Sequence, residues 1–201
     1  MVKKLPDHLG DPVDNIFASG ADFFCPLFKC FGATPNLITS LSLVAGLGAI
    51  YQVWRENYKS GALLFILAYF LDVMDGFYAR KYNMETKFGD WYDHISDTIK
   101  NGIMLLLVIY LLFVNEKYFV IGIIILVCCM VFINLGCQEK YVELVKSEVM
   151  ESVSLNNFKW MCRAGEKDSV SRQLSVIRFA GPGIGILIIS GIIYNLEEIL
   201  K

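Results

Sequence analysis

Residues 62–80 read ALLFILAYFLDVMDGFYAR, an apolar run with two aspartates near its end. The next apolar segment opens with FGDWYDHISD, residues 88–97, which contains three more aspartates: Asp90 near its start, and Asp93 and Asp97 one helical turn apart. A membrane-spanning helix needs about 20 mostly apolar residues. A charged side chain at membrane depth costs at least about 2.5 kcal/mol, so acids there are rare and mark a functional site. The two segments therefore predict neighbouring membrane helices that share a polar, chemically active end.

The composition extends this prediction to the whole chain. Hydrophobic residues occupy 55% of the 201 positions, and the mean hydropathy is +0.50. A soluble domain is usually about 45–50% apolar, so the excess indicates an all-α integral membrane protein. The six cysteines form no CxxC pair and are expected to be ordinary small apolar residues. Five transmembrane helices are expected, at about Leu37–Trp54, Ala62–Ala79, Ile95–Val114, Tyr118–Gly136 and Ser175–Leu196.

The part of the chain before the first span is more polar. Residues 1–33 are expected to form a cytoplasmic N-terminal segment, and residues 34–201 the membrane domain. Within the first segment, Asn15–Phe31 predicts an amphipathic helix, which either lies in the membrane interface or packs as a cap on the bundle. Thr34 is expected to cap the first span, and Pro35 to begin it.

A second polar stretch, Gln138–Gln173, separates the fourth span from the fifth and is too charged to enter lipid. It predicts a surface helix at Glu139–Val153, followed by a loop around Arg163–Gly165. The fifth span contains Gly181-Pro182-Gly183, which predicts a kink.

The lysines and arginines predict the orientation, because cations concentrate on the cytoplasmic side of membrane proteins. With a cytoplasmic N-terminus, the outer side holds only Arg55, Lys59, Lys117 and Lys201. All other cations, Lys100 included, then fall on the inner side, and the acidic ends of the second and third spans face the cytoplasm. A net charge of -2 without a dense basic cluster argues against nucleic acid as a partner.

The four acids are spaced so that they converge. Asp72 and Asp75 are three residues apart and share a helix face, and Asp93 and Asp97 are four apart and do the same. A short connection makes the two helices antiparallel neighbours, so the pairs meet in one cleft. Clustered carboxylates need cations, and their hard oxygen atoms suit Mg²⁺ or Mn²⁺. Two such ions clamp a pyrophosphate, which predicts metal-dependent phosphoryl transfer.

Three other interpretations fit these acids less well. A cation transporter needs acids along the depth of several helices, whereas these four lie at one end of two consecutive helices. A buried polar network would only tie the helices together. A scaffold with a degenerate site has no need of four intact aspartates.

The spacing of these residues resembles the signature of a known enzyme family. Eight residues across 26 positions follow the pattern Asp72-x2-Asp75-Gly76-x2-Ala79-Arg80-x8-Gly89-x3-Asp93-x3-Asp97. This is similar, at every fixed position, to the signature of the class I CDP-alcohol phosphatidyltransferases. The segment TPNLIT, residues 34–39, also resembles that family's lead-in to its first membrane helix. The resemblance covers about Thr34–Val114 well and the rest only in general character.

The resemblance implies transfer of a phospho-alcohol group from a CDP-alcohol to an acceptor alcohol, with release of CMP, in phospholipid synthesis. It implies that Asp72, Asp75, Asp93 and Asp97 hold two divalent ions and that Asp97 is the general base on the acceptor hydroxyl. Its implied partners are the CDP-alcohol, a lipid or alcohol acceptor and membrane lipids, and a homodimer is compatible with it. Its signature positions place the CDP moiety against Asn36, Thr39, Gly76, Ala79, Arg80, Thr86 and Gly89.

Two details stay open at this stage. The family usually has six membrane helices, so either part of Val142–Trp160 forms a short or re-entrant segment or the bundle has five. The Asp93-His94 pair resembles the choline and ethanolamine phosphotransferases and favours CDP-choline or CDP-ethanolamine with diacylglycerol. The short chain favours the alternative, CDP-diacylglycerol with inositol, glycerol phosphate or serine.

Overall fold

A computed structural model describes residues 5–145, 159–162 and 165–201, and within these ranges every regular element is a helix. The N-terminal half contains α1 (Pro12–Cys30), α2 (Pro35–Trp54), α3 (Tyr58–Lys81) and α4 (Lys87–Val114). The C-terminal half contains α5 (Tyr118–Val145), α6 (Lys167–Ile177), η2 (Arg178–Ala180), α7 (Pro182–Tyr194) and α8 (Leu196–Ile199). Five segments of the described chain are long and apolar enough to cross a membrane, namely α2, α3, α4, α5 and the stretch from α6 through α7. The predicted all-α membrane bundle is confirmed.

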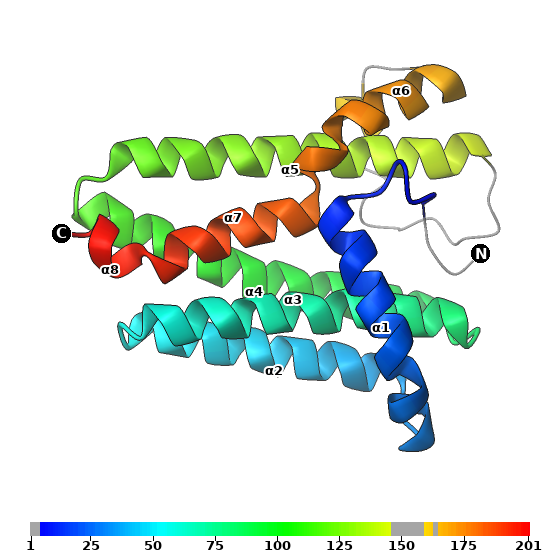
Figure 1. The fold of residues 1–201 in the computed structure, drawn as a ribbon, viewed down its shortest axis with the longest axis horizontal. Coiled ribbons are helices and arrows are strands. Elements are labelled where there is room, and N and C mark those ends of the chain that lie inside the picture. The colour runs from blue at the N-terminus through cyan, green and yellow to red at the C-terminus, as the bar shows by residue number, and fades with distance from the viewer. Residues whose placement is uncertain (1–4, 146–158, 163–164) are drawn as a thin grey trace.

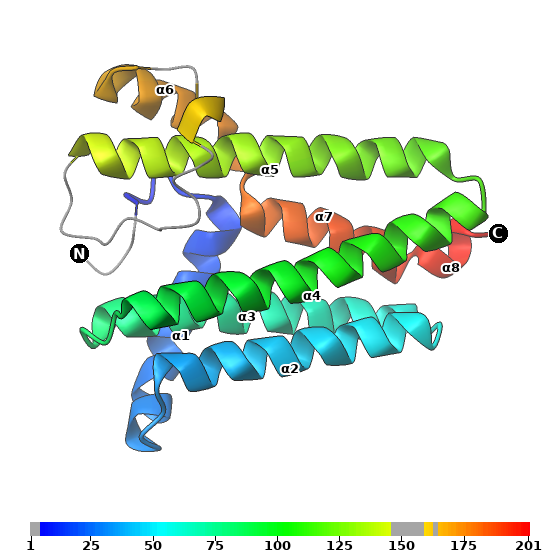
Figure 2. The same ribbon diagram turned by 180° about the vertical axis from the view of Figure 1, so that it is seen from behind.

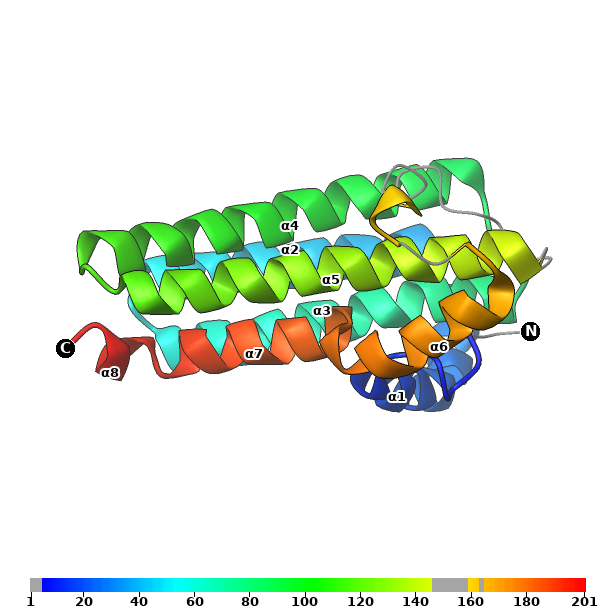
Figure 3. The same ribbon diagram turned by 90° about the horizontal axis from the view of Figure 1, so that it is seen from above.

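The long helices run side by side along one axis, and α1 crosses them at one end (Figures 1 and 2). The α3–α4 connection and the C-terminal end of α5 lie at that same end, whereas the α2–α3 and α4–α5 connections lie at the other. Helix α5 packs against both α4 and α7 and carries α6 on its side (Figure 3). The largest apolar core, around Phe65, Met104 and Val108, fills the bundle away from α1. The polar residues of α3 and α4 are therefore left at the α1 end.

Local signals start the first membrane helix where the sequence predicts. The side chain of Thr34 accepts a hydrogen bond from the amide of Leu37 at 3.3 Å, and Pro35 is the first residue of α2. The helix then returns through a tight connection into α3. At Gly61 a Cβ atom would lie 2.6 Å from a methyl group of Val53, so the glycine lets α2 and α3 approach closely.

Helix α1 packs against the bundle as the second alternative for the N-terminal segment predicts. Its small residues Ala18, Ala21 and Cys25 are buried, and the helix packs against α3 and α7. Its other side exposes Phe23, and Phe31 directly after its end is exposed as well, with exposed fractions of 79% and 81%. The helix therefore caps the bundle with one face and presents an aromatic face outward.

The predicted surface helix at Glu139–Val153 needs correction. Residues 139–145 continue α5 without a break, and residues 146–153 and 163–164 lie outside the described residues. The continuation is stable because α6 covers it, with Cys137 and Tyr141 packed against Val170 and Leu174. A charged stretch that looks solvent-exposed in the sequence thus forms a helix–helix contact.

The last span is not one continuous helix over Ser175–Leu196. Helix α6 ends at Ile177, a short 3-10 turn follows, and α7 begins at Pro182. Proline has no amide hydrogen to give to the preceding turn, so it is tolerated at the start of a helix and breaks one elsewhere. Asp11 accepts a hydrogen bond from the amide of Ile184 at 3.0 Å, which ties the start of α7 to the start of α1. The predicted kink is therefore a break.

Two cysteines are not the simple apolar residues that composition predicts. Cys137 in α5 and Cys162 form a disulfide that spans 25 residues. The bond fixes the segment before α6 to the side of α5. No spacing motif marks this pair, because the partners meet only through the packing of α6 on α5.

Candidate active site

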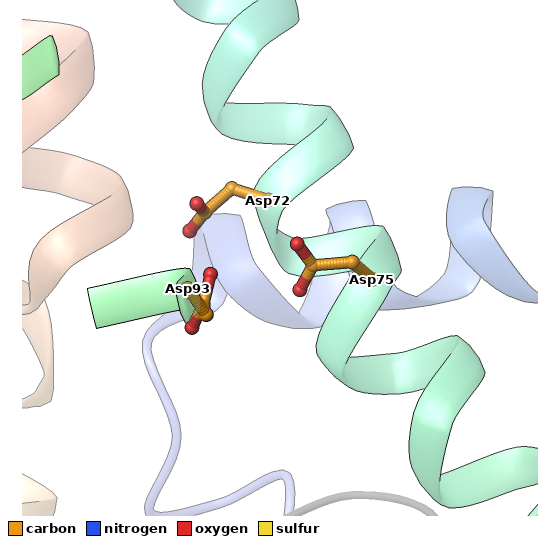
Figure 4. A group of neighbouring side chains, drawn as sticks. All are labelled: Asp72, Asp75 and Asp93. Carbon is orange, nitrogen blue, oxygen red and sulfur yellow. The ribbon is translucent and has the colours of Figure 1, made fainter. Parts of the chain in front are cut away.

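Three aspartates from two helices meet at the α1 end of the bundle. Asp72 and Asp75 project from α3 toward Asp93 of α4, and their carboxylates face one another (Figure 4). One oxygen of each lies within 4.8 Å of the others. Asp75 is the most enclosed, with an exposed fraction of 4%. The helical spacing brings these acids together as the sequence predicts.

The donor set of this cluster fits a hard divalent cation. Oδ2 of Asp75 and Oδ1 of Asp93 are buried and accept no hydrogen bond from the residues that the structure describes. Buried carboxylate oxygens nearly always have a partner. Mg²⁺ and Mn²⁺ take carboxylate oxygens as ligands. Asp72, Asp75 and Asp93 can therefore hold a divalent ion between α3 and α4.

The fourth aspartate is held by a lysine. Asp97 lies one turn beyond Asp93 on α4, and its Oδ1 is 2.7 Å from Nζ of Lys100. The same Nζ is 2.5 Å from Oδ1 of Asp72 and donates a hydrogen bond to Oγ of Ser42 at 2.6 Å. Lys100, which the charge distribution counts among the inner-side cations, is 1% exposed and lies inside the bundle. Its position three residues after Asp97, on the same helix face, is the signal that sequence reasoning missed.

A cavity of about 190 Å³ lies beside the acids, between α2 and the facing ends of α3 and α4. Asp75 and Asp93 form part of its wall, so it opens directly onto the carboxylate cluster. His94 also lines it, with Nδ1 3.6 Å from Oδ2 of Asp93. The structure brings all the predicted CDP-contacting residues into this wall: Asn36, Thr39, Gly76, Ala79, Arg80, Thr86 and Gly89.

Two glycines shape this first cavity. Thr86 caps α4 by accepting a hydrogen bond from the amide of Gly89 at 2.9 Å. A Cβ atom on Gly89 would lie 3.0 Å from Oγ1 of Thr86 and 3.2 Å from Oδ1 of Asn36, so only glycine leaves these polar groups undisturbed. At Gly76 a Cβ atom would lie 3.3 Å from a guanidinium nitrogen of Arg80, which folds back over it. The signature glycines thus position the polar side chains of the wall.

A second cavity, of about 220 Å³, lies on the other side of the cluster toward α1 and α5. It is lined by Asp72, Asp75 and Asp93 of the cluster, and Gln138 of α5 also lies in its wall. The acids therefore stand between two cavities. This arrangement suits a reaction in which two molecules meet at the carboxylate cluster.

Asp14 lies in the wall of the second cavity, and the pKa of its carboxyl group is raised. The hydroxyl of Tyr69 donates a hydrogen bond to Oδ1 of Asp14 at 2.6 Å. Burial raises the pKa of Asp14 from 3.8 to about 7, the Tyr69 bond lowers it, and the charges of Asp11 and Asp72 raise it further. The protein therefore favours the neutral form of this carboxyl group.

The pH dependence of stability follows from Asp14. Below its unfolded pKa of 3.8 the group is protonated in both states. Between that pH and about pH 7, the folded protein keeps a proton on Asp14 that the unfolded chain has already released. The contribution of Asp14 therefore lowers the free energy of unfolding as the pH rises through this range. Above the folded pKa of about 7, this loss of stability is complete. Asp14→Asn removes this cost and is expected to have a higher melting temperature than wild type at about pH 8, with little difference near about pH 4.

Scanning fluorimetry of both proteins across this pH range measures the effect. Tyr69→Phe is the matched control, because it removes the hydrogen bond that favours the ionised carboxylate and should enlarge the loss of stability at high pH. Equal melting curves for wild type and Asp14→Asn at every pH would contradict the assignment.

Comparison with known proteins decides the family. The sequence profile described as CDP-alcohol phosphatidyltransferase matches residues 33–151, which include the four aspartates and the whole wall of the first cavity. The chain belongs to the CDP-alcohol phosphatidyltransferase family. The resemblance in the spacing of the acids is thereby confirmed.

Individual relatives match over shorter regions. A CDP-diacylglycerol–glycerol-3-phosphate 3-phosphatidyltransferase of Rickettsia felis is 45% identical over 51 residues, covering 25% of this chain and 28% of that protein. One of Aquifex aeolicus is 35% identical over 65 residues, covering 32% and 36%. An archaetidylinositol phosphate synthase of Pyrococcus horikoshii is 30% identical over 105 residues, or 52% of each chain. The matches thus span from about a quarter to about half of these relatives. No solved structure matches the chain significantly.

Proposed function

We propose that this family member transfers a phosphatidyl group from CDP-diacylglycerol to a polar alcohol and releases CMP. The observation that carries the proposal is the first cavity, which collects every residue predicted to contact the CDP moiety beside a cluster of acids that could bind metal. The relatives support the choice of donor, since several are named for CDP-diacylglycerol and glycerol 3-phosphate. They therefore favour the second of the two substrate pairs that the sequence leaves open.

The pair first favoured by the sequence, CDP-choline or CDP-ethanolamine with diacylglycerol, remains the second candidate. Its specific support is His94, which follows Asp93 and lines the cavity assigned to the CDP moiety. The two candidates differ in which substrate carries the lipid, so one assay separates them.

The proposed cofactor is a pair of divalent ions, Mg²⁺ or Mn²⁺. Asp72, Asp75 and Asp93 would hold them, with Asp97 as a further ligand. Bound ions would neutralise the pyrophosphate and stabilise the leaving CMP. Arg80 and the polar residues around Gly89 would hold the nucleotide part of the donor in the first cavity, which fixes the reacting phosphorus near the acids.

We propose that the acceptor alcohol binds in the second cavity, next to Asp72, Asp75 and Asp93. Asp97 takes the proton of its hydroxyl group while the hydroxyl oxygen forms a bond to the phosphorus that carries the lipid. The bond between that phosphorus and the bridging oxygen of CMP breaks, and CMP leaves with the electron pair. The products are a phospholipid, CMP and a proton held by Asp97.

The active site is proposed to face the cytoplasm. The support is the distribution of lysines and arginines, which are concentrated in the segments at the α1 end of the bundle. CDP-linked donors made in the cytoplasm would reach the first cavity directly from that side.

CMP release by the purified protein tests the function. The donors are CDP-diacylglycerol, CDP-choline and CDP-ethanolamine, and the acceptors are glycerol 3-phosphate, inositol, serine and diacylglycerol, each with Mg²⁺ or Mn²⁺. We expect CMP from CDP-diacylglycerol with one polar acceptor and none after chelation of the metal. CMP from CDP-choline with diacylglycerol would establish the second candidate, and no CMP from any pair would overturn both.

Gly76→Ala tests the donor cavity. Its new methyl group pushes on the guanidinium group of Arg80 at 3.3 Å, so we expect the KM for the CDP donor to rise about tenfold with a smaller change in kcat. Gly102→Ala in α4 is the matched control, because a Cβ atom there meets nothing within 4 Å. An unchanged KM in Gly76→Ala would contradict the role given to Arg80.

A further inference from the structure

Lys100 links three helices beside the acid cluster. It projects from α4, pairs with Asp72 of α3 at 2.5 Å and donates to Ser42 of α2 at 2.6 Å. The pair with Asp97 at 2.7 Å completes its contacts. The ammonium group therefore sits where the three helices that form the first cavity meet.

The surroundings of Lys100 are shaped for this position. A Cβ atom on Gly46 of α2 would lie 2.9 Å from Cβ of Lys100, so the glycine gives room for the lysine stem. The hydroxyl of Ser42 donates its hydrogen to the carbonyl oxygen of Ala68 at 2.8 Å. The oxygen of Ser42 is therefore left to accept a hydrogen bond from the ammonium group of Lys100. The side chain points into the bundle, whereas a lysine that anchors to the membrane surface extends toward water.

The neighbouring carboxylates explain why the charged side chain of Lys100 can be buried inside the bundle. A buried ammonium group is costly unless it is paired and hydrogen-bonded, and Lys100 has two carboxylates and a hydroxyl. Clustered carboxylates repel one another in turn. The ammonium group of Lys100 pairs with both Asp72 and Asp97, so it bridges the two carboxylates and offsets part of the charge that they share.

We propose that Lys100 is a positioning residue of the proposed active site. Its ammonium group holds Asp72 and Asp97 in place and offsets part of their charge. The proposal rests on the proposed function for its catalytic part, since Asp97 is the residue that it positions. The consequence for metal binding is independent of any substrate. The lysine lowers the attraction of the cluster for divalent ions and orders its carboxylates.

Removing the charge should therefore move metal affinity and turnover in opposite senses. Lys100→Met and Lys100→Gln are titrated with Mn²⁺ alone, and free Mn²⁺ is followed by electron paramagnetic resonance. We expect the Kd of Mn²⁺ to fall about tenfold or more, because a positive charge next to the ions is gone. In the CMP assay we expect kcat to fall about 100-fold, with the KM for the donor nearly unchanged, because Asp97 loses its support.

A lysine that only ties helices together gives a different pattern. Loss of such a tie loosens the site, so Mn²⁺ affinity would stay equal or weaken together with turnover. Ser42→Ala is the matched control, because it removes one hydrogen bond of Lys100 and keeps the charge. We expect its Mn²⁺ affinity to equal that of wild type.

A second measurement covers variants with low stability. The melting temperature is recorded with increasing Mn²⁺, and the proposal requires a larger Mn²⁺-induced gain in Lys100→Gln than in wild type. An equal or smaller gain, or an unchanged or higher Kd, overturns the proposal. If no substrate pair releases CMP, the proposed function fails, while the Mn²⁺ titration still decides the effect of Lys100 on the cluster.

Discussion

Asp75→Asn is expected to abolish measurable CMP release, with kcat/KM lower by about 1,000-fold or more. Asp75 is the most enclosed acid of the cluster, and its Oδ2 accepts no hydrogen bond from the described residues. Asparagine has the same shape but gives a neutral oxygen or an amide group in place of a metal ligand. The pyrophosphate would then lose the charge stabilisation on which transfer depends.

The same substitution should have the opposite effect on the metal-free fold. Replacing one of the facing carboxylates relieves repulsion with Asp72 and Asp93, so the melting temperature without metal should rise or stay equal. The gain on adding Mn²⁺ should largely disappear. Scanning fluorimetry with and without Mn²⁺ measures both effects, and a full Mn²⁺-induced gain in Asp75→Asn would contradict the metal assignment.

Asp22→Asn is the control for a loss of charge alone. Asp22 forms a surface ion pair with Lys81 at 2.6 Å, and its side chain is 58% exposed. Exposed pairs contribute little to stability, typically below about 1 kcal/mol. The control should keep activity and the full response to Mn²⁺.

Much of the site follows from the sequence because helical spacing is a local property. Once residues 62–80 and 88–97 are helices, the faces of Asp72, Asp75 and Asp93 are fixed, and a short connection brings the faces together. The resemblance to the family predicts seven residues that contact the CDP moiety, and these seven lie around one cavity. The residues closest in sequence to the acids were thus the most predictable.

The remaining features depend on contacts between segments far apart in sequence. A lysine stem can reach outward or inward from the same helix position, so the inward direction of Lys100 is set by the space beside Gly46 and by Asp72 on another helix. The extension of α5 to Val145 depends on its cover by α6, and the pairing of Cys137 depends on the same contact. No periodicity within one segment carries that information.

Asp97→Asn is expected to separate proton transfer from metal binding. A general base contributes about 100- to 10,000-fold, so kcat should fall within that range while the KM for the donor changes little. The fold should persist, because Lys100 keeps its pair with Asp72 and its bond to Ser42. Asp72, Asp75 and Asp93 remain in place, so Mn²⁺ binding should weaken far less than in Asp75→Asn.

Comparing Asp75→Asn with Asp97→Asn distinguishes a metal ligand from a general base at Asp97. If Asp97 acts mainly as a metal ligand, both variants lose the Mn²⁺-induced gain in melting temperature to the same extent. If it acts mainly as the base, Asp97→Asn keeps most of that gain and still loses turnover. The pH profile of kcat adds a second criterion, since the limb that reports the base should vanish in Asp97→Asn and persist in wild type. Full activity in Asp97→Asn would exclude Asp97 from the reaction and assign the proton to another group at the cluster.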